Sequence, residues 1–141
     1  MKNTKLPQPP EFHFAILRHI TGEDIHWDLL LELPGRSGLA TWQIRRDPDL
    51  WVHPECSETG TWFLARALPD HRRIYLDYQG PISGRRGHVT QVDGGKLVIF
   101  FLNETRLEVG LTGRHYALRL ILRRAESGAD VWELHAEKDA D

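Results

Sequence analysis

The sequence predicts an all-β fold, arranged as a sandwich or a barrel. Short segments alternate between apolar and polar side chains, which is the pattern of half-buried strands. The connections between them are short and rich in turn residues, as at Thr112-Gly113 and over residues 126–130. No stretch of ten or more residues shows helical periodicity. Many short strands joined by tight turns are typical of these two architectures.

The chain divides into a polar, proline-rich N-terminal arm over residues 1–11 and a single domain over residues 12–137. A proline-containing loop that runs to about Thr59 is the longest irregular section and the natural place for a mobile flap. Glycines recur at positions 84, 87, 94 and 95, and a glycine-rich loop is expected over Gly84 to Gly87. Strands are expected, in chain order, over residues 12–19, 25–33, 39–45, 62–68, 73–78, 96–102, 106–111, 116–122 and 131–135.

Composition narrows the possible functions. The charged fraction of 27% and the hydrophobic fraction of 40% are ordinary for a soluble domain. The net charge of −2 provides no overall positive field, so any binding of nucleic acid must depend on a local cluster. The single cysteine, Cys56, excludes an internal disulfide and fits a reducing compartment. No secretory signal or run of ~18 apolar residues is present, so a cytoplasmic protein without membrane contact is expected.

The most informative stretch runs from residue 19 to residue 32 and reads HITGEDIHWDLLLE. His26 and Asp28 are two positions apart on a strand and therefore point to the same face. His19 ends the preceding strand, so a turn can bring it beside them. Two histidines and one carboxylate with open positions form a common site for a divalent metal. The same residues also fit the solvated face of a half-buried strand, so the spacing alone leaves both interpretations open.

A second group of polar residues follows. If residues 73–78 form a strand, alternation puts several polar side chains on one face, and Arg85 and Arg86 come next between glycines. Histidine and arginine can donate hydrogen bonds to phosphate, and tyrosine adds a phenolic donor. This group would suit an anionic ligand beside a metal, although each residue also fits a solvated loop or simple packing. The side chains of the shared face are those of His71, Arg73, Tyr75 and Asp77.

Taken together, the pattern resembles the 3'-phosphoesterase domain of bacterial ATP-dependent DNA ligase D, over about residues 12–131. The most specific match is an Asp-His segment followed by a tyrosine, an aspartate, an aromatic residue and a glycine. The matching positions in this sequence are Phe14, His19, His26-Trp27-Asp28, Leu31-Glu32, Ala40 to Ile44 with Trp42, Asp70-His71, Tyr75, Asp77-Tyr78, Gly80, Gly84 to Gly87, and Gly113 to Leu118.

The resemblance implies a small, closed or partly open antiparallel β-barrel enzyme with a ligand cleft. It implies a metal-dependent hydrolase that removes a 3'-terminal ribonucleoside or a 3'-phosphate from nucleic acid, in DNA repair by non-homologous end joining, with repair proteins as possible partners. The expected cofactor is manganese, with zinc or iron(II) also compatible. The roles carried over are metal ligands at His19, His26 and Asp28, and catalytic groups at His71 and Tyr75. Arg73, Arg85 and Arg86 are candidate phosphate contacts, and Glu32 is expected to orient a ligand histidine.

Three departures distinguish this chain from the family. The spacing from His19 to His26 is one residue longer, and two family arginines correspond to Leu30 and Phe63. Each lost guanidinium removes charge-assisted hydrogen bonds worth roughly 1.5–3 kcal/mol. One alternative is therefore a non-catalytic module that binds DNA ends or a repair partner. Another is an enzyme that acts on a small phosphodiester or an unrelated substrate.

Overall fold

The computed structural model describes residues 11–52, 61–126 and 128–139, and its fold is all-β. Most of the predicted arm and flap, together with Cys56, lie outside the described residues. Among the described residues, no helix has the length and apolar character needed to cross a bilayer. The elements are β1 (Phe12–Thr21), β2 (Asp24–Leu31), β3 (Leu39–Ile44), η1 (Pro48–Leu50), β4 (Phe63–His71), η3 (Arg73–Leu76), β5 (Gly80–Pro81), β6 (His88–Leu102), β7 (Arg106–Gly113), β8 (Ala117–Arg124) and β9 (Val131–Lys138).

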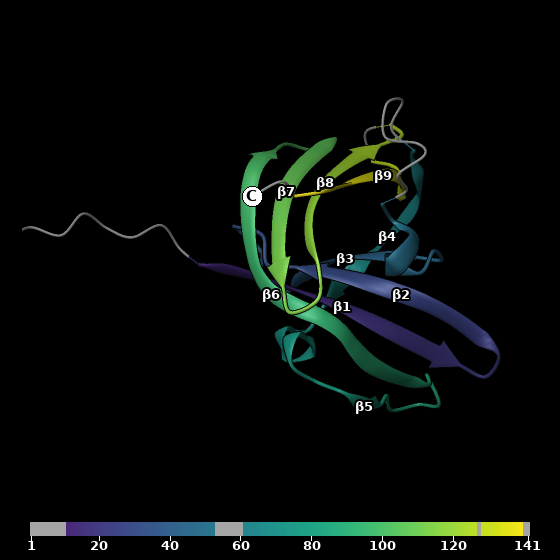
Figure 1. Ribbon diagram of the computed structural model, residues 1–141. Coiled ribbons are helices and arrows are strands. Elements are labelled where there is room, and N and C mark those ends of the chain that lie inside the picture. Colours follow the sequence, from purple (N-terminus) through teal and green to yellow (C-terminus); the bar gives the residue numbers. More distant parts are fainter. Residues whose placement is uncertain (1–10, 53–60, 127, 140–141) are drawn as a thin grey trace, which may run out of the picture.

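Eight of the strands form a ring in the order β1-β2-β3-β4-β9-β8-β7-β6, and the pairing of β1 with β6 closes it. Every pair is antiparallel. The ring is uneven because the 15-residue strand β6 pairs with β7 along one half and with β1 and β5 along the other. Figure 1 shows this division, with β7, β8 and the upper half of β6 upright and β1 and β2 crossing below them. Of the two predicted architectures, the sandwich and the barrel, the fold is therefore closer to the barrel, although the ring is only partly barrel-like.

The interior of the ring is the main hydrophobic core, and the alternation of β2 accounts for its contribution. Leu29 and Leu31 are fully buried there, as the pattern predicted for the odd positions. The rings of Trp42 and Trp132 meet edge to face inside the ring, with their centroids 5.5 Å apart. Burial of these apolar side chains is the main favourable term that holds the strands together.

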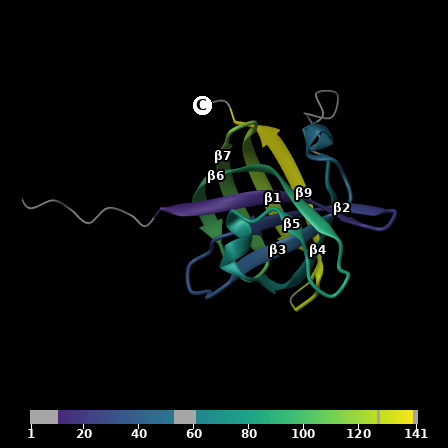
Figure 2. The ribbon, with the colours of Figure 1, turned by 90° about the horizontal axis from the view of Figure 1, so that it is seen from below.

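A second, smaller hydrophobic core, which we call the outer core, lies on the outer face of β1 and β2. Leu30, at an even position of β2, is fully buried in it, although the pattern predicted a polar face there. The segment from η3 to β5 covers this face, and Figure 2 shows η3 and β5 lying over β1. Polar residues that share this face are therefore buried as well. The cluster consists of Ala15, Leu17, Leu30, Leu39 and Val89, with Tyr75, Leu76, Tyr78 and Ile82 packed against it.

Two expected elements differ from the structure. Residues 73–78 do not form a strand, because a short helix, η3, covers Arg73–Leu76 and its first turn closes with a 3.0 Å bond from the Tyr75 N–H to the Arg72 carbonyl. The chain pairs with β6 only at Gly80–Pro81, and before that Leu76 packs on the outer core. The second difference is that β6 already begins at His88, well before the strand that was expected from residue 96. Strands β4 and β9 are longer than expected.

Candidate metal centre and cleft

The β1–β2 hairpin brings His19 and His26 together. A two-residue turn that contains Gly22, with φ of +58°, joins the strands, and His19 and His26 are direct partners in the register. Their ring centroids are 4.6 Å apart. Opposite residues of an antiparallel pair lie on the same face, which explains why the predicted return of His19 takes place.

Asp28 completes the cluster. Its Oδ2 lies 3.5 Å from His19 Nδ1, and its Oδ1 lies 3.4 Å from His26 Nε2. One ligand atom from each of the three residues lies within 4.8 Å of the others. His26 and Asp28 are buried, and only 2% of Asp28 is exposed. The three residues predicted as metal ligands therefore form one compact site.

The outer nitrogen of each histidine has a hydrogen-bond acceptor of its own. His19 Nε2 donates to the carbonyl oxygen of Arg86 at 2.6 Å, and His26 Nδ1 lies 3.2 Å from the Asp24 carboxylate. Arg45 in turn holds Asp24 through a 2.6 Å ion pair. Because the outer nitrogens carry the protons in the neutral rings, the nitrogens that face Asp28 are left as lone-pair donors. Metal-binding histidines are oriented in this way.

The carboxylate of Asp28 has unused capacity. Its Oδ1 is buried and, within the described part of the chain, has no hydrogen-bond partner, although His26 Nε2 lies 3.4 Å away. Burial alone would raise the pKa of Asp28, but the interactions with the nearby rings of His19 and His26 outweigh burial and lower it. The hydrogen bond to Asp28 raises the pKa of His19, against the effect of burial. A proton on His19 thus supplies positive charge where a cation would lie.

These observations fit a divalent metal. The buried Asp28 oxygen and one nitrogen from each oriented histidine ring lie close together. They provide the ligands of a two-histidine, one-carboxylate metal site. Manganese, zinc and iron(II) all accept this donor set. His19, His26 and Asp28 would hold the ion, and Asp24 and the Arg86 carbonyl would orient the histidines. Asp24 was not predicted from the sequence. The only indication was its position two residues before His26, on the same face of the strand.

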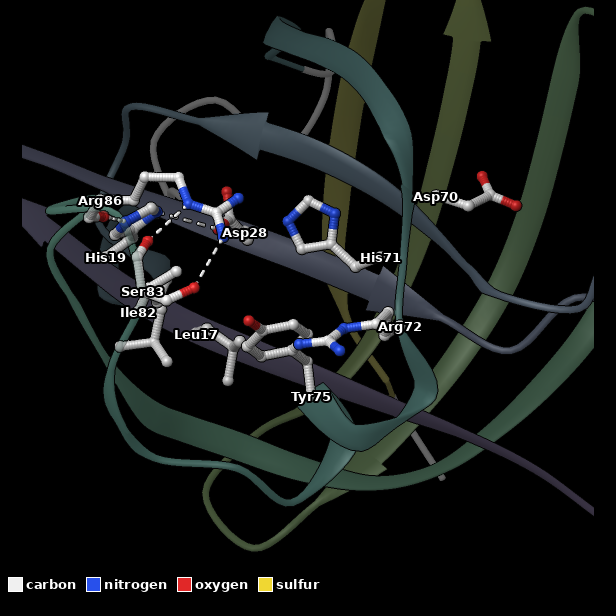
Figure 3. A pocket seen from close by; sticks show the side chains of 11 residues that line it. Leu17, His19, Asp28, Asp70, His71, Arg72, Tyr75, Ile82, Ser83 and Arg86 are labelled. Carbon is white, nitrogen blue, oxygen red and sulfur yellow. Dashed lines mark hydrogen bonds and ion pairs between the residues drawn. The ribbon is translucent and has the colours of Figure 1, made fainter.

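A cleft of about 450 Å³ opens beside the cluster. Figure 3 shows His19 and Asp28 on one side of it, with His71 and Tyr75 on the other. Both catalytic candidates therefore face the predicted metal ligands across one cavity. The lining residues are Leu17, His19, Asp28, Asp70, His71, Arg72, Tyr75, Ile82, Ser83, Arg86 and Val89.

His71 is oriented by the main chain at the end of β4. Its Nδ1 donates to the Pro69 carbonyl oxygen at 3.1 Å, which leaves Nε2 for a ligand. The ring of Tyr75 lies 5.9 Å from that of His71, because the turn of η3 places Tyr75 under it. The two residues meet through this helical turn and not through the strand alternation that was predicted.

Glu32 and Arg73 lie elsewhere. The Glu32 carboxylate accepts a 2.8 Å hydrogen bond from His13 and pairs with the Arg73 guanidinium. Glu32 therefore does not orient a ligand histidine, and Arg73 does not line the cleft, which corrects both predictions. The Glu32–Arg73 pair instead ties η3 to β2. Sequence reasoning placed Arg73 wrongly because a helix, unlike a strand, does not keep residues 71 and 73 on one face.

The two arginines of the glycine-rich loop differ. Arg86 lines the cleft, and its guanidinium is held by the Ser83 carbonyl at 2.8 Å and the Ser83 hydroxyl at 3.3 Å. Arg85 is exposed at a φ of +58° and is not among the cleft residues. Gly87 is required by space, because a Cβ there would lie 2.0 Å from the Ile20 carbonyl oxygen.

The positions of the two absent family arginines are now apolar packing sites. Leu30 is fully buried in the outer core. Phe63 packs against Trp51 with ring centroids 6.1 Å apart and lies under the Arg46 guanidinium at 4.7 Å. Neither position contributes charge to the cleft. Polar side chains of the cleft near His71 include Arg86 and also Arg72 and Ser83, which no sequence motif had predicted.

Comparison with protein-family models gives no match for this chain. Comparison with curated proteins gives no significant match either.

Proposed function

We propose that this chain is a divalent-metal-dependent phosphoesterase that trims the 3' ends of nucleic acid, related to the 3'-phosphoesterase domain of ligase D. The observation that carries the proposal is a single cleft in which a two-histidine, one-carboxylate cluster faces His71. The Asp28 oxygen without a partner supports a metal at the cluster. Manganese is the ion we expect, and a DNA primer–template is the expected substrate.

Each polar residue of the cleft has its own role in the proposed reaction. A metal held by His19, His26 and Asp28 would polarise a phosphoryl oxygen and activate a water. Arg86 presents a fixed guanidinium to the phosphate, since Ser83 holds it in place. His71, whose ring is oriented by the Nδ1 hydrogen bond to Pro69, would act in its imidazolium form and donate the Nε2 proton to the leaving oxygen. Tyr75 offers a phenol beside His71 as a further hydrogen-bond donor.

The direct test is cleavage of a labelled primer–template that ends in a 3'-ribonucleotide or a 3'-phosphate, with and without manganese. Wild-type protein should trim both ends only with metal, and His71→Ala should lower turnover about 100-fold or more, as loss of a general acid does. His115→Ala is the matched control, because this histidine is exposed on the β7–β8 turn and lies outside the cleft. Full turnover in His71→Ala, or turnover without metal, contradicts the proposal.

A second candidate function is a non-catalytic module that binds nucleic-acid ends. The burial of Leu30 and Phe63 in packing contacts favours it, because the cleft then has fewer cations than a catalytic phosphate site of this family. Such a module would bind ends in a salt-dependent way without metal-stimulated cleavage. The same substrates, measured by fluorescence anisotropy at two salt concentrations, separate the two functions.

A further inference from the structure

A smaller chamber of about 200 Å³ adjoins the cleft, between η3 and the segment over residues 80–83. Four residues line both cavities, namely Arg72, Tyr75, Ile82 and Ser83. Because the cavities share these residues, they are neighbours in the fold. The chamber is completed by Ile74, Tyr78 and Pro81.

The chamber has the chemistry of a site for a flat, uncharged ring. The rings of Tyr75 and Tyr78 are perpendicular, with centroids 5.6 Å apart, and Pro81 and Ile82 add apolar surface. The Arg72 guanidinium lies 6.0 Å from the Tyr75 ring centroid and gives the wall a positive charge. Among the residues that the structure describes, no aspartate or glutamate lines the chamber. Nucleobases stack on aromatic rings and guanidinium groups in this kind of setting.

The arrangement also has the spacing of a nucleotide. Tyr75 lies between His71, at 5.9 Å, and Tyr78, at 5.6 Å, measured between ring centroids. A phosphate beside His71 and a base beside Tyr78 would therefore lie on either side of the Tyr75 ring, with the sugar passing along the edge of that ring. Figure 3 shows Tyr75 with Arg72 beside it at the cleft.

The chamber wall is held in place before any ligand arrives. The Tyr78 hydroxyl donates to the Pro81 carbonyl oxygen, and the Ile82 N–H donates to the Gly87 carbonyl at 2.8 Å. The Gln91 side chain donates to the Leu76 carbonyl at 2.6 Å and anchors the end of η3. A preformed wall reduces the entropy lost when a base binds.

We infer that this chamber binds the nucleobase next to the phosphate that is cleaved, so that the substrate is recognised as a nucleotide and not as a phosphoester alone. The inference rests on the proposed function, because it assumes that the phosphate lies in the cleft. Tyr78 is then a specificity residue that contacts the base, and the chamber excludes small phosphoesters without an aromatic ring as preferred substrates.

The test compares two oligonucleotides that end in a 3'-phosphate and differ only in the last nucleotide, which carries a base in one and is abasic in the other. With manganese present, wild-type protein should show a KM for the abasic substrate roughly tenfold higher, as expected for loss of one stacked base. Tyr78→Leu removes the ring but keeps apolar volume on the outer core, and it should bring the KM ratio close to one. Tyr78→Phe keeps the ring and should keep the ratio.

Tyr116→Leu, which changes a tyrosine outside both cavities, is the control and should keep the wild-type ratio. Equal KM values in the wild-type protein, or an unchanged ratio in Tyr78→Leu, overturn the inference, and the wild-type comparison does not depend on the folding of a variant. If neither substrate is cleaved, the proposed function fails. The inference about the chamber is then tested by the Kd values of the two oligonucleotides, measured by fluorescence anisotropy with manganese. A preference for the base that Tyr78→Leu abolishes still supports the chamber, and equal Kd values reject it.

Discussion

The Nε2 atom of His19 donates a 2.6 Å hydrogen bond to the carbonyl oxygen of Arg86. This contact joins β1 to the glycine-rich loop, which is 67 residues further along the chain. It orients a proposed metal ligand and fixes the main chain of the residue whose guanidinium faces the cleft. The Thr21 hydroxyl donates to the same carbonyl at 3.1 Å, so the metal cluster and the phosphate side of the cleft share one support.

Loss of the acceptor for His26 should weaken metal binding. Asp24→Ala removes the carboxylate that lies 3.2 Å from His26 Nδ1, and comparable losses reduce metal affinity by about 10–100-fold. The measurement is the Kd for manganese by isothermal titration calorimetry. Glu23→Ala changes the neighbouring exposed carboxylate and serves as control. An unchanged Kd in Asp24→Ala would mean that Asp24 does not orient the ligand.

The cluster should respond to pH in opposite ways with and without metal. The raised pKa of His19 gives stability that is complete below its ordinary value of 6.5 and is lost as the pH rises through the folded-state pKa. The lowered pKa of Asp28 gives stability above its ordinary value of 3.8, lost as the pH falls through the folded-state pKa. The metal-free pair therefore stabilises the fold most between these two values.

Metal binding must displace the proton from His19, so the increase in Tm caused by manganese should be larger at about pH 7.5 than at about pH 5.5. Thermal unfolding followed by circular dichroism at both pH values measures this. Asp28→Asn should lose most of the manganese effect at both. An equal increase in Tm at the two pH values would argue against competition between metal and proton at His19.

Gly87 should tolerate no side chain. A Cβ at this position would lie 2.0 Å from the Ile20 carbonyl oxygen, and the backbone has φ of +91°. Gly87→Ala should therefore lower the free energy of unfolding by about 2 kcal/mol or more and displace the Arg86 carbonyl from His19. Gly84→Ala is the comparison, because it has φ of +74° but no neighbour closer than 3.7 Å. Urea unfolding should show the smaller loss for Gly84→Ala, and similar losses would contradict the steric argument.

An arginine at Leu30 should be rejected by the fold. Leu30 is fully buried in the outer core, so Leu30→Arg places a charge where no water or partner can reach it without disrupting η3. We expect a loss of at least about 4 kcal/mol in the free energy of unfolding. Leu30→Met should cost less than about 1.5 kcal/mol. A stable Leu30→Arg protein with higher phosphoesterase turnover would show that the family arginine can still be accommodated.

Asp93 should be a major contributor to stability. It is fully buried and accepts hydrogen bonds from the backbone N–H groups of Gly94, Arg114, His115 and Tyr116, at 2.9, 2.7, 3.2 and 2.9 Å. Asp93→Ala leaves these donors without their acceptor and should cost roughly 3 kcal/mol or more. Asp93→Asn keeps one oxygen and should cost less. Denaturant unfolding measures both, and equal losses would show that the second oxygen is unimportant.

Patterns that depend on neighbours along the chain were predictable. The odd positions of β2, such as Leu29 and Leu31, were recognised as core residues because alternation is a local property of a strand. The hairpin that pairs His19 with His26 follows from two strands joined by a turn containing glycine. Seven of the expected strands required only small changes at their ends.

Features that depend on distant contacts were not predictable. Residues 73–78 have the composition of a strand, but Arg73–Leu76 form η3, and Tyr75 and Leu76 pack on the outer core. The same packing buries Leu30, which the alternation had placed on a polar face. The pairing of Glu32 with Arg73 is a consequence of that helix.

By itself, the sequence determined the all-β class, most strands and the three residues of the metal cluster, because these follow from alternation and from a hairpin of short range. Only the tertiary structure decided what surrounds the cluster. Closure between β1 and β6 brought the Arg86 carbonyl to His19, and the packing of η3 on the outer core placed Tyr75 beside His71. Contacts across so many residues depend on how the whole core packs, and no local spacing records them.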